Sequence, residues 1–465
     1  MTEKIQRRSF LKASGALLAG SLFPAYSSAG VSKKMKKPNI LYILVDDMGW
    51  SDVGYHDSQL QSPNIDRLVK SGAEMDCFYV QPQCTPTRVA LMTGKYPSRF
   101  GNHCIQASNK QAYPKGTQTM ASMLKKQGYD TAVMGKWHMG SKPEWGPNHH
   151  GFDYSYGSLS GAIGMYDHRY RLDSEYVKTW HRNSEFAEEE VGHVTDLVTR
   201  EAVNWLKEDK RKENPFFLYM AYHSVHIPLV ENHRTVAKFD YIKDPDRRLM
   251  AAAVYHLDQC VGRLLDTLEE LGIRENTLIV FSSDNGGLKD GSRKPPLGEP
   301  EHYPQPNPQL GKDFSMNDPL RGGKCTAFEG GIRVPACVNW KGVIKPQKMT
   351  QRMHIVDWMP TIAHLTGCRT DPEWDGKDMW KHITGKAEKN ESRDVYIVWH
   401  SGRTWEALIS GDWKIVRNGQ NSKWQLYDLS NDPYETVNLA DTNKKKFSEL
   451  VQIYKKERSK DAKGV

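Results

Sequence analysis

The chain has 465 residues, 38% of them hydrophobic and 10% aromatic, so it can build a large core and does not need disulfides or a metal to fold. The net charge of +8 lies at the ends, with +7 on residues 1–37 and +5 on residues 444–465, which leaves −4 between them. A nucleic-acid-binding protein would carry basic charge on its folded body, and a membrane span would need an apolar run of about 20 residues, so the sequence predicts neither.

The first 29 residues have the pattern of an export signal. The sequence QRRSFLK over residues 6–12 resembles a twin-arginine signal, and a mildly apolar stretch follows over residues 13–23. Small residues at 27–29 offer a site for a signal peptidase, and the absence of a cysteine there argues against a lipoprotein anchor. We expect a bacterial protein that is exported already folded and is periplasmic or secreted.

Four short apolar runs each end in polar residues. The runs cover residues 39–45, 131–134, 216–220 and 278–281, and the polar residues after them include Asp46, Asp47, Lys136, His138, His223, His226, Asp284 and Asn285. Helical patterns at 64–70, 119–126, 195–206 and 249–271 alternate with these runs. The alternation predicts a doubly wound α/β sheet, in which ligands bind beyond the carboxyl ends of the strands.

A smaller unit is predicted at the C-terminus. The main body ends after a helix over residues 357–367, and a polar linker follows over residues 386–392. Alternating runs at 395–399, 405–409, 413–416 and 424–429 predict an antiparallel sheet, with a helix near residues 447–456. We therefore expect a signal over residues 1–29, a main domain over residues 30–385 and an α+β subdomain over residues 386–465.

Cys84 lies at the predicted N-terminus of a helix. Thr85 is expected to be its N-cap, Pro86 its first residue and Gly94 its C-terminal glycine. Free N–H groups and the helix dipole favour an anion at this position, which Arg88 can also face, so these residues allow either an activated thiolate or a packed cysteine. The seven cysteines contain no CxxC pair that would indicate zinc.

These motifs together resemble those of the formylglycine-dependent sulfatases. The segment Cys84-x-Pro-x-Arg, followed by Thr-Gly-Lys at 93–95, is similar to the signature in which that family converts cysteine to formylglycine. The family's other blocks are resembled, in order, by residues 38–49, 135–138, 223–226, 284–286, 320–324 and 329–335. The resemblance covers residues 38–440 and is closest to the arylsulfatase B-like, glycan-acting branch. Thr87 stands where Ser or Ala is more usual.

The resemblance implies a fold, a modification and a metal. The fold would be alkaline-phosphatase-like, a doubly wound mixed sheet flanked by helices with a smaller C-terminal antiparallel sheet plus helix. A formylglycine-generating or radical sulfatase-maturating enzyme would convert Cys84 to formylglycine. The implied metal ligands are Asp46, Asp47, Cys84 in its converted form, Asp284 and Asn285. Hard oxygen donors suit Ca²⁺ or Mg²⁺ rather than zinc, and the family implies Ca²⁺.

The resemblance also implies catalytic roles. Breaking a sulfate ester requires cations around the sulfate oxygens, a nucleophile and a proton for the leaving alcohol. The implied catalytic residues are Cys84, Arg88, Lys136, His138, His226 and Lys324. The diol derived from Cys84 would attack, Arg88 would orient it, and Lys136 and Lys324 would bind the sulfate. His226 would be the general acid, and His138 the base that restores the aldehyde.

The expected substrate is a sulfated carbohydrate. Two long segments, residues 141–193 and 289–318, would overhang the strand ends and carry aromatic and basic side chains suited to sugars and sulfates. The expected substrate-binding residues are Lys136, His226, Lys324, His168 and His302.

Two other functions stay open on these residues. A phosphonate or phosphate ester hydrolase of the same superfamily would use the same metal ligands, because both substrates present a tetrahedral oxyanion. Lys136 and Lys324 together with His226 resemble the sulfatase version more. A non-catalytic sulfoglycan-binding protein would leave Cys84 unconverted and would not need the acid and base.

Overall fold

The computed structural model describes residues 37–57, 59–170, 172–187, 190–208, 213–289, 314–388, 391–401 and 403–465. The predicted export signal and the predicted substrate contact His302 therefore lie outside the described residues. Residues 37–465 belong to one compact unit.

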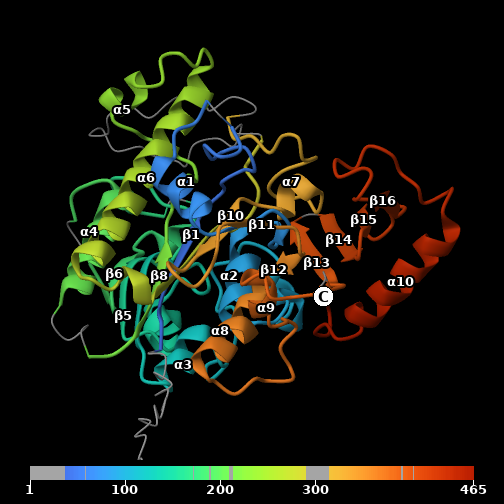
Figure 1. Ribbon diagram of the computed structural model, residues 1–465, viewed down its shortest axis with the longest axis horizontal. Coiled ribbons are helices and arrows are strands. Elements are labelled where there is room, and N and C mark those ends of the chain that lie inside the picture. The colour runs from blue at the N-terminus through green and yellow to red at the C-terminus, as the bar shows by residue number, and fades with distance from the viewer. Residues whose placement is uncertain are drawn as a thin grey trace, which may run out of the picture. The chain divides into compact units, whose positions relative to one another are not determined.

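Ten strands form one sheet within the described residues, in the order β11-β2-β10-β9-β1-β8-β4-β5-β6-β7 (Figure 1). The strands are β1 (Asn39–Val45), β2 (Ala73–Met75), β4 (Asp130–Lys136), β5 (Tyr154–Ser158), β6 (Trp180–Arg182), β7 (Glu185–Phe186), β8 (Phe216–Ala221), β9 (Thr277–Ser283), β10 (Ala336–Asn339) and β11 (Gln347–Met349). The neighbours β9, β1, β8, β4 and β5 are parallel, whereas β10, β6 and β7 pair antiparallel. The mixed sheet confirms the predicted fold class.

The register of the central strands brings the four predicted polar ends to one edge. Val45 of β1 pairs with Ser283 of β9, and Leu44 pairs with Ala221 of β8. On the other side of β8, Ala221 pairs with Gly135 of β4. The residues that follow these positions must therefore meet at the same carboxyl edge of the sheet.

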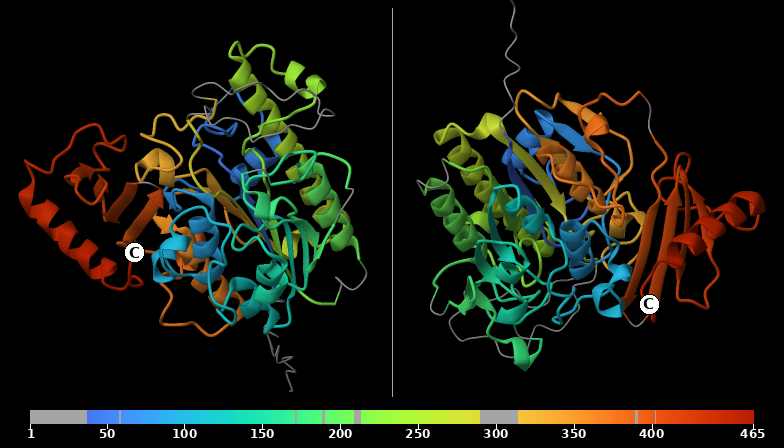
Figure 2. Two further views of the ribbon diagram at one scale, coloured as in Figure 1. Left: turned by 180° about the vertical axis from the view of Figure 1, so that it is seen from behind. Right: turned by 90° about the horizontal axis from the view of Figure 1, so that it is seen from below.

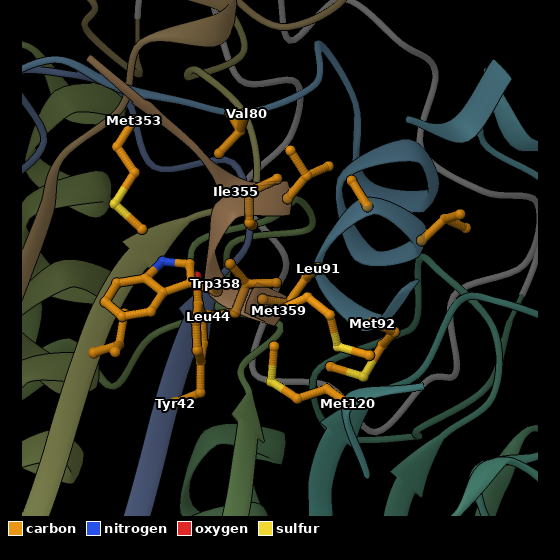
Figure 3. Packing of buried hydrophobic residues seen from close by; sticks show 14 of the residues in the cluster. Tyr42, Leu44, Val80, Leu91, Met92, Met120, Met353, Ile355, Trp358 and Met359 are labelled. Carbon is orange, nitrogen blue, oxygen red and sulfur yellow. The ribbon is translucent and has the colours of Figure 1, made fainter. Parts of the chain in front are cut away.

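Helices cover both faces of the sheet, because its central strands are apolar on both sides. Alternate residues of β1 point into two separate core clusters, Tyr42 and Leu44 into one and Leu41 and Ile43 into the other. The first face is covered by α2 (Cys84–Thr93), α3 (Met120–Lys125), α8 (Trp358–Thr366) and α9 (Trp380–Ile383), and the second by α1 (Pro63–Lys70), α4 (Val194–Lys207) and α6 (Pro245–Glu270) (Figure 2). Trp358 meets Tyr42 edge-on, with ring centroids 5.9 Å apart (Figure 3).

The predicted helices are confirmed, with small shifts at their ends. Thr119 caps α3 in a capping box with Ser122, and Asp244 caps α6 by accepting hydrogen bonds from two backbone N–H groups. Two further helices of the main body are α5 (His233–Ala237) and α7 (Glu329–Ile332). Among the described helices, none combines the length and the apolar composition that crossing a bilayer requires.

The prediction that the segment 141–193 overhangs the strand ends is only partly right. The segment contributes β5, β6 and β7 to the sheet itself. Trp180 lies in β6, is buried, and packs against Tyr156 and His168. An aromatic side chain that completes a core gains more from burial than from exposure at a rim, so a strand replaces the expected loop.

The C-terminal residues form the predicted antiparallel sheet, in the order β13 (Val395–Ser401), β14 (Arg403–Ser410), β15 (Trp413–Asn418) and β16 (Gln425–Asp428). Helix α10 (Lys444–Arg458) packs on one face through Leu450 and Tyr454. The opposite face packs against Tyr79, Ala327 and Ile332 of the main body (Figure 2). A two-stranded sheet of β3 (Phe78–Tyr79) and β12 (Met353–His354) lies beside this contact.

Candidate active site

Cys84 is the first residue of α2 and is 3% exposed. The N-cap is Gln83, so the prediction that Thr85 caps the helix is wrong. The Thr85 hydroxyl is used elsewhere, because it donates to His138 O at 3.1 Å and accepts from Ser108 N at 3.2 Å. Gly94 ends the helix in the left-handed region, as predicted.

The buried environment of Cys84 disfavours a thiolate. Burial raises the pKa of the Cys84 thiol, while the nearby charges of Lys136 and Lys324 oppose this shift. The unmodified side chain is therefore a neutral thiol at neutral pH and a weak nucleophile. Burial therefore disfavours the activated thiolate that the helix position alone allowed.

Four oxygen-bearing side chains meet Cys84 at the edge of the sheet. Asp46 and Asp47 follow β1, and Asp284 and Asn285 follow β9, all of them buried. Asn285 Nδ2 donates to Asp47 Oδ1 at 2.8 Å, and Asp47 N donates to Asp284 Oδ1 at 3.3 Å. Candidate ligand atoms of Asp46, Cys84 and Asp284 all lie within 4.8 Å of one another. The structure thus brings together the complete predicted set of metal ligands.

Three buried cations pair with the three carboxylates. Lys136 Nζ lies 2.5 Å from Asp46 Oδ2, and Lys324 Nζ lies 2.6 Å from Asp47 Oδ1. Arg88 Nη2 lies 2.8 Å from Asp284 Oδ2. The negative and positive charges are therefore equal in number around Cys84. Such pairing is required, because an uncompensated buried charge is strongly destabilising.

The pKa values of the carboxylates differ. Burial tends to raise the pKa of Asp46, but Lys136, His226 and Arg88 hold it well below its ordinary value. Burial and the charge of Asp46 raise the pKa of Asp284 to about 7. Carboxylates this close repel one another, so full ionisation of the set calls for additional positive charge.

Two buried oxygen atoms indicate where an additional positive charge can bind. Asp46 Oδ1 and Asn285 Oδ1 have no hydrogen-bond partner among the residues that the structure describes. Buried polar atoms are nearly always satisfied, so each of these acceptors calls for a partner. Carboxylate and amide oxygens are the ligands that Ca²⁺ and Mg²⁺ prefer. The residues present therefore fit a hard divalent cation.

His226 lies beside the carboxylates. Its Nδ1–H donates to Ile227 O at 2.5 Å, which leaves Nε2 3.5 Å from Asp47 Oδ2. Burial lowers the pKa of His226 to about 4, with Asp47 opposing the shift. The ring is therefore neutral in the free site, and a bound anionic substrate would favour its protonated form.

His138 follows β4 and faces the same site. Its backbone φ is 54°, and a Cβ at residue 161 would lie 2.2 Å from its ring, so Gly161 makes room for the imidazole. His138 Nδ1 has no hydrogen-bond partner among the described residues. Burial and the charges of Lys136 and Arg88 keep its pKa well below the ordinary value. The ring is therefore neutral, and its Nδ1 is free to bind a group of the site.

His168 makes its contacts within its own segment. It is buried, its Nε2–H donates to Gly192 O at 2.9 Å, and its ring centroid lies 4.7 Å from that of Trp180. Its predicted contact with substrate stays a prediction.

Sequence reasoning missed the tyrosines around the site. Arg88 Nη1 donates to Tyr219 OH at 3.5 Å, and Tyr219 came from an apolar run interpreted only as core. Tyr170 hydrogen-bonds to Asn109, and burial raises its pKa while the charge of Lys136 opposes the shift, so it lies near the site. Because long loops position both Tyr170 and Asn109, no local pattern could have identified them.

Buried carboxylates and cations at the carboxyl edge of a doubly wound sheet suit the binding of an anionic ester and the stabilisation of charge as it reacts. Comparison with known proteins narrows this chemistry. A sequence profile of the sulfatase family matches residues 38–368, and a profile described as N-sulphoglucosamine sulphohydrolase, C-terminal, matches residues 323–462. The chain belongs to the sulfatase family, whose members hydrolyse sulfuric esters.

Several characterised proteins resemble the chain over most of its length. N-acetylgalactosamine-6-sulfatase of Homo sapiens is 32% identical over 86% of this chain and 75% of its own. N-acetylgalactosamine-6-O-sulfatase of Bacteroides thetaiotaomicron is 28% identical over 90% of this chain and 92% of its own. The crystal structure of Ps i-CgsB in complex with k-i-k-neocarrahexaose has 32% identity and a TM-score of 0.80, covering 92% of this chain and 94% of that one.

Proposed function

We propose that this protein releases sulfate from sulfated carbohydrates, with residue 84 as nucleophile after conversion of Cys84 to formylglycine. The observation that carries the proposal is the meeting of Lys136, Lys324 and Arg88 around Cys84 in a member of the sulfatase family. Those cations can stabilise the charge that shifts between the oxygens as the S–O bond breaks. A formylglycine-generating or radical sulfatase-maturating enzyme would act as maturation partner.

We propose Ca²⁺ as the resident cation, held by Asp46, Asp47, Asp284, Asn285 and the converted residue 84. When bound, it would supply Lewis-acid stabilisation of anionic oxygens. It would also neutralise the carboxylates that Lys136 and Lys324 pair with in this structure. The two ammonium groups are then available to bind the sulfate.

The histidines would move the protons. His226 Nε2 faces the carboxylates and can give a proton to the leaving alcohol once the anionic substrate raises its pKa. His138 is neutral and its Nδ1 has no partner among the described residues, so in the tautomer that leaves Nδ1 without a proton it can take the proton from residue 84 that its regeneration requires. Arg88 is held by Asp284 and by Lys136 O, which fixes its guanidinium beside residue 84.

The substrate class is supported by the relatives. Two of them are named for N-acetylgalactosamine 6-sulfate, and a similar structure holds a neocarrahexaose. We propose that His168 and His302 contribute to binding the glycan. We also propose that residues 1–29 direct export to the periplasm or out of the cell, where the protein would meet polysaccharides. Residues 30–385 would form the catalytic domain, and residues 386–465 would form the C-terminal α+β subdomain.

The substrate proposal predicts sulfate release from glycans rather than from free aryl sulfates. The panel would contain carrageenan, ulvan and fucan fragments, sulfated galactosamine and glucosamine, nitrophenyl and nitrocatechol sulfates, and nitrophenyl phosphate. Ion chromatography of released sulfate and phosphate should show the highest kcat/KM on one sulfated glycan. Efficient turnover of aryl sulfates with no release from any glycan would contradict the proposal, and preference for the phosphate ester would point to the related esterase chemistry.

Asp284→Ala should lower both metal content and activity. The substitution removes a carboxylate from the proposed metal ligands and takes from Arg88 its nearest carboxylate partner, so some loss of stability is expected too. Metal content would be measured by mass spectrometry of the purified protein, with the exposed Asp266→Ala as control. Tightly bound stoichiometric zinc in the unmutated protein, without calcium or magnesium, would refute the oxygen-ligated site.

His226→Ala should slow poor leaving groups most. A sugar alkoxide needs a proton, whereas nitrophenolate hardly does, so we expect a loss of roughly 10²–10⁴-fold on the glycan and a smaller loss on the aryl sulfate. The two kcat values would be compared in the same preparation. Equal losses on both substrates would mean that His226 positions the substrate rather than protonating it.

A further inference from the structure

Two histidines and two carboxylates meet between α4 and α6, apart from the residues proposed for catalysis. His193 is the N-cap of α4, and Asp196 lies in its first turn. His256 lies on α6, and Glu231 comes shortly before α5. One ligand atom from each of His193, Asp196 and His256 lies within 4.8 Å of the other two. The structure thus brings together a second group of candidate metal ligands.

The side chains of this cluster face one another closely. His256 Nε2 lies 3.1 Å from Asp196 Oδ2, and the ring centroids of His193 and His256 are 4.7 Å apart. His193 Nδ1 accepts a hydrogen bond from Thr195 N at 3.2 Å, and its Nε2 lies 3.9 Å from Glu231 Oε1. Two ligand atoms on a tetrahedral zinc, with bonds of about 2.0–2.2 Å, lie about 3.3–3.6 Å apart. Small rotations of these side chains would therefore place their ligand atoms around one ion.

Two further side chains orient the candidate ligands from outside. Glu231 Oε2 lies 3.0 Å from His256 Nδ1, and the Glu231 side chain is only 4% exposed. Arg263 Nη2 lies 2.5 Å from Asp196 Oδ1, which leaves Oδ2 of that carboxylate facing His256. A histidine that binds a metal almost always donates its other ring N–H to a carboxylate or a carbonyl. Glu231 occupies the position of that outer partner.

His256 is itself a cation in this structure. Burial disfavours its charged ring, but hydrogen bonds to Asp196, Cys260 and Glu231 raise its pKa to about 12. His256 and Arg263 together then balance the charges of the two carboxylates. Carboxylates that hold one positive charge this firmly attract a divalent ion more strongly, because the attraction grows with the charge.

Binding of a divalent ion would rearrange the protons of both imidazoles. His256 would release its Nε2 proton to water and keep the Nδ1 proton that Glu231 accepts. His193 would keep one ring proton but carry it on Nδ1, so the hydrogen bond from Thr195 N would be lost. Bonds from the ion to two imidazoles and a carboxylate would offset that cost.

We propose that His193, Asp196 and His256 form a second metal site that binds Zn²⁺. Imidazole nitrogen suits zinc, whereas Ca²⁺ takes oxygen ligands. Three protein ligands leave a fourth position for water. The Asp196 side chain is 47% exposed, so the ion can enter from the surface. The ion would join α4 to α6 and, through Glu231, to the segment that follows His226, which gives it a structural role.

Calorimetric titration of the full-length chain with Zn²⁺ tests the proposal. The parent protein is Cys84→Ala, kept in excess Ca²⁺ so that the oxygen ligands near residue 84 are occupied. His193→Ala and Asp196→Asn each remove one proposed ligand, and each should bind zinc at least about tenfold more weakly than the parent. His149→Ala and His364→Ala remove exposed histidines elsewhere and should bind zinc as the parent does. Circular dichroism of every variant would verify that it is folded, and the partly exposed Asp196→Asn keeps the side-chain volume.

Two further measurements distinguish this site from the catalytic one. Zinc binding should persist in Asp284→Ala, which lacks a ligand of the proposed calcium site. Glu231→Gln, which removes only the outer carboxylate, should weaken zinc binding by roughly 10–100-fold. Co²⁺ in place of Zn²⁺ should give the intense visible absorption of a four-coordinate ion, and Asp196→Asn should reduce it. Equal zinc affinity in the ligand variants and the controls, or a cobalt spectrum that Asp196→Asn leaves unchanged, would overturn the proposal. None of these measurements requires turnover, so the result does not depend on the proposed function.

Discussion

Cys84→Ala should abolish sulfate release while the protein still folds. The substitution removes the atom from which the proposed nucleophile is made, and losing a nucleophile costs roughly 10⁴–10⁶-fold in kcat. Cys84 is the first residue of α2, so the helix loses no interior hydrogen bond, and the cavity left by one sulfur atom is small. Sulfate release would be followed by ion chromatography and folding by circular dichroism.

Cys104→Ala is the matched control for this variant. Cys104 is also buried and unpaired, but it lies after α2 and its Sγ–H donates to Ala112 O at 2.6 Å. That variant should keep its turnover. Mass spectrometry of the unmutated protein, made together with its maturation enzyme, should find formylglycine at residue 84 and unmodified cysteine at residue 104. Full activity of Cys84→Ala would disprove the proposed nucleophile.

The central strands could be predicted because each is a local pattern. An apolar run followed by Asp, Lys, His or Asn is visible without knowing what pairs with it, and β1 begins and ends at the predicted residues. The meeting of Asp46, Asp284 and Lys136 follows from the parallel register, since β9, β1, β8 and β4 lie side by side and their carboxyl ends share one edge of the sheet.

Features that depend on distant partners could not be predicted. Thr85 has the ideal chemistry for an N-cap, yet His138 O and Ser108 N, which are remote in sequence, occupy its hydroxyl. Strands β6 and β7 have three and two residues, too short for an alternating pattern to stand out. The contact between the main body and the C-terminal sheet could not be predicted either. It depends on buried charged residues that cannot be told from surface residues in the sequence.

Lys414 of β15 lies at the centre of this contact between the main body and the C-terminal sheet. It is buried, with Nζ 2.9 Å from Glu329 Oε1 and 2.8 Å from Glu435 Oε1. Glu329 begins α7, shortly after Lys324 of the active site, and its other oxygen accepts from Tyr79 OH at 2.9 Å. The C-terminal sheet therefore holds the segment that carries Lys324, the lysine proposed to bind the sulfate.

Lys414→Met should destabilise the protein by about 3–5 kcal/mol, because two buried carboxylates lose their shared cation while the side-chain volume is nearly kept. The exposed Lys455→Met is the control, with an expected change within about 0.5 kcal/mol. Chemical denaturation followed by fluorescence would measure both.

The deficit of Lys414→Met should also depend on pH. Burial and Glu329 already raise the pKa of Glu435 to about 7, against the opposing charge of Lys414, and removing that charge raises the pKa of both glutamates in the folded protein. The folded state then binds protons more readily than the unfolded chain, so the stability of the variant falls as the pH rises. Relative to the unmutated protein, the loss should be greater near pH 8 than near pH 5. A loss independent of pH would mean that Lys414 acts through packing rather than through its charge.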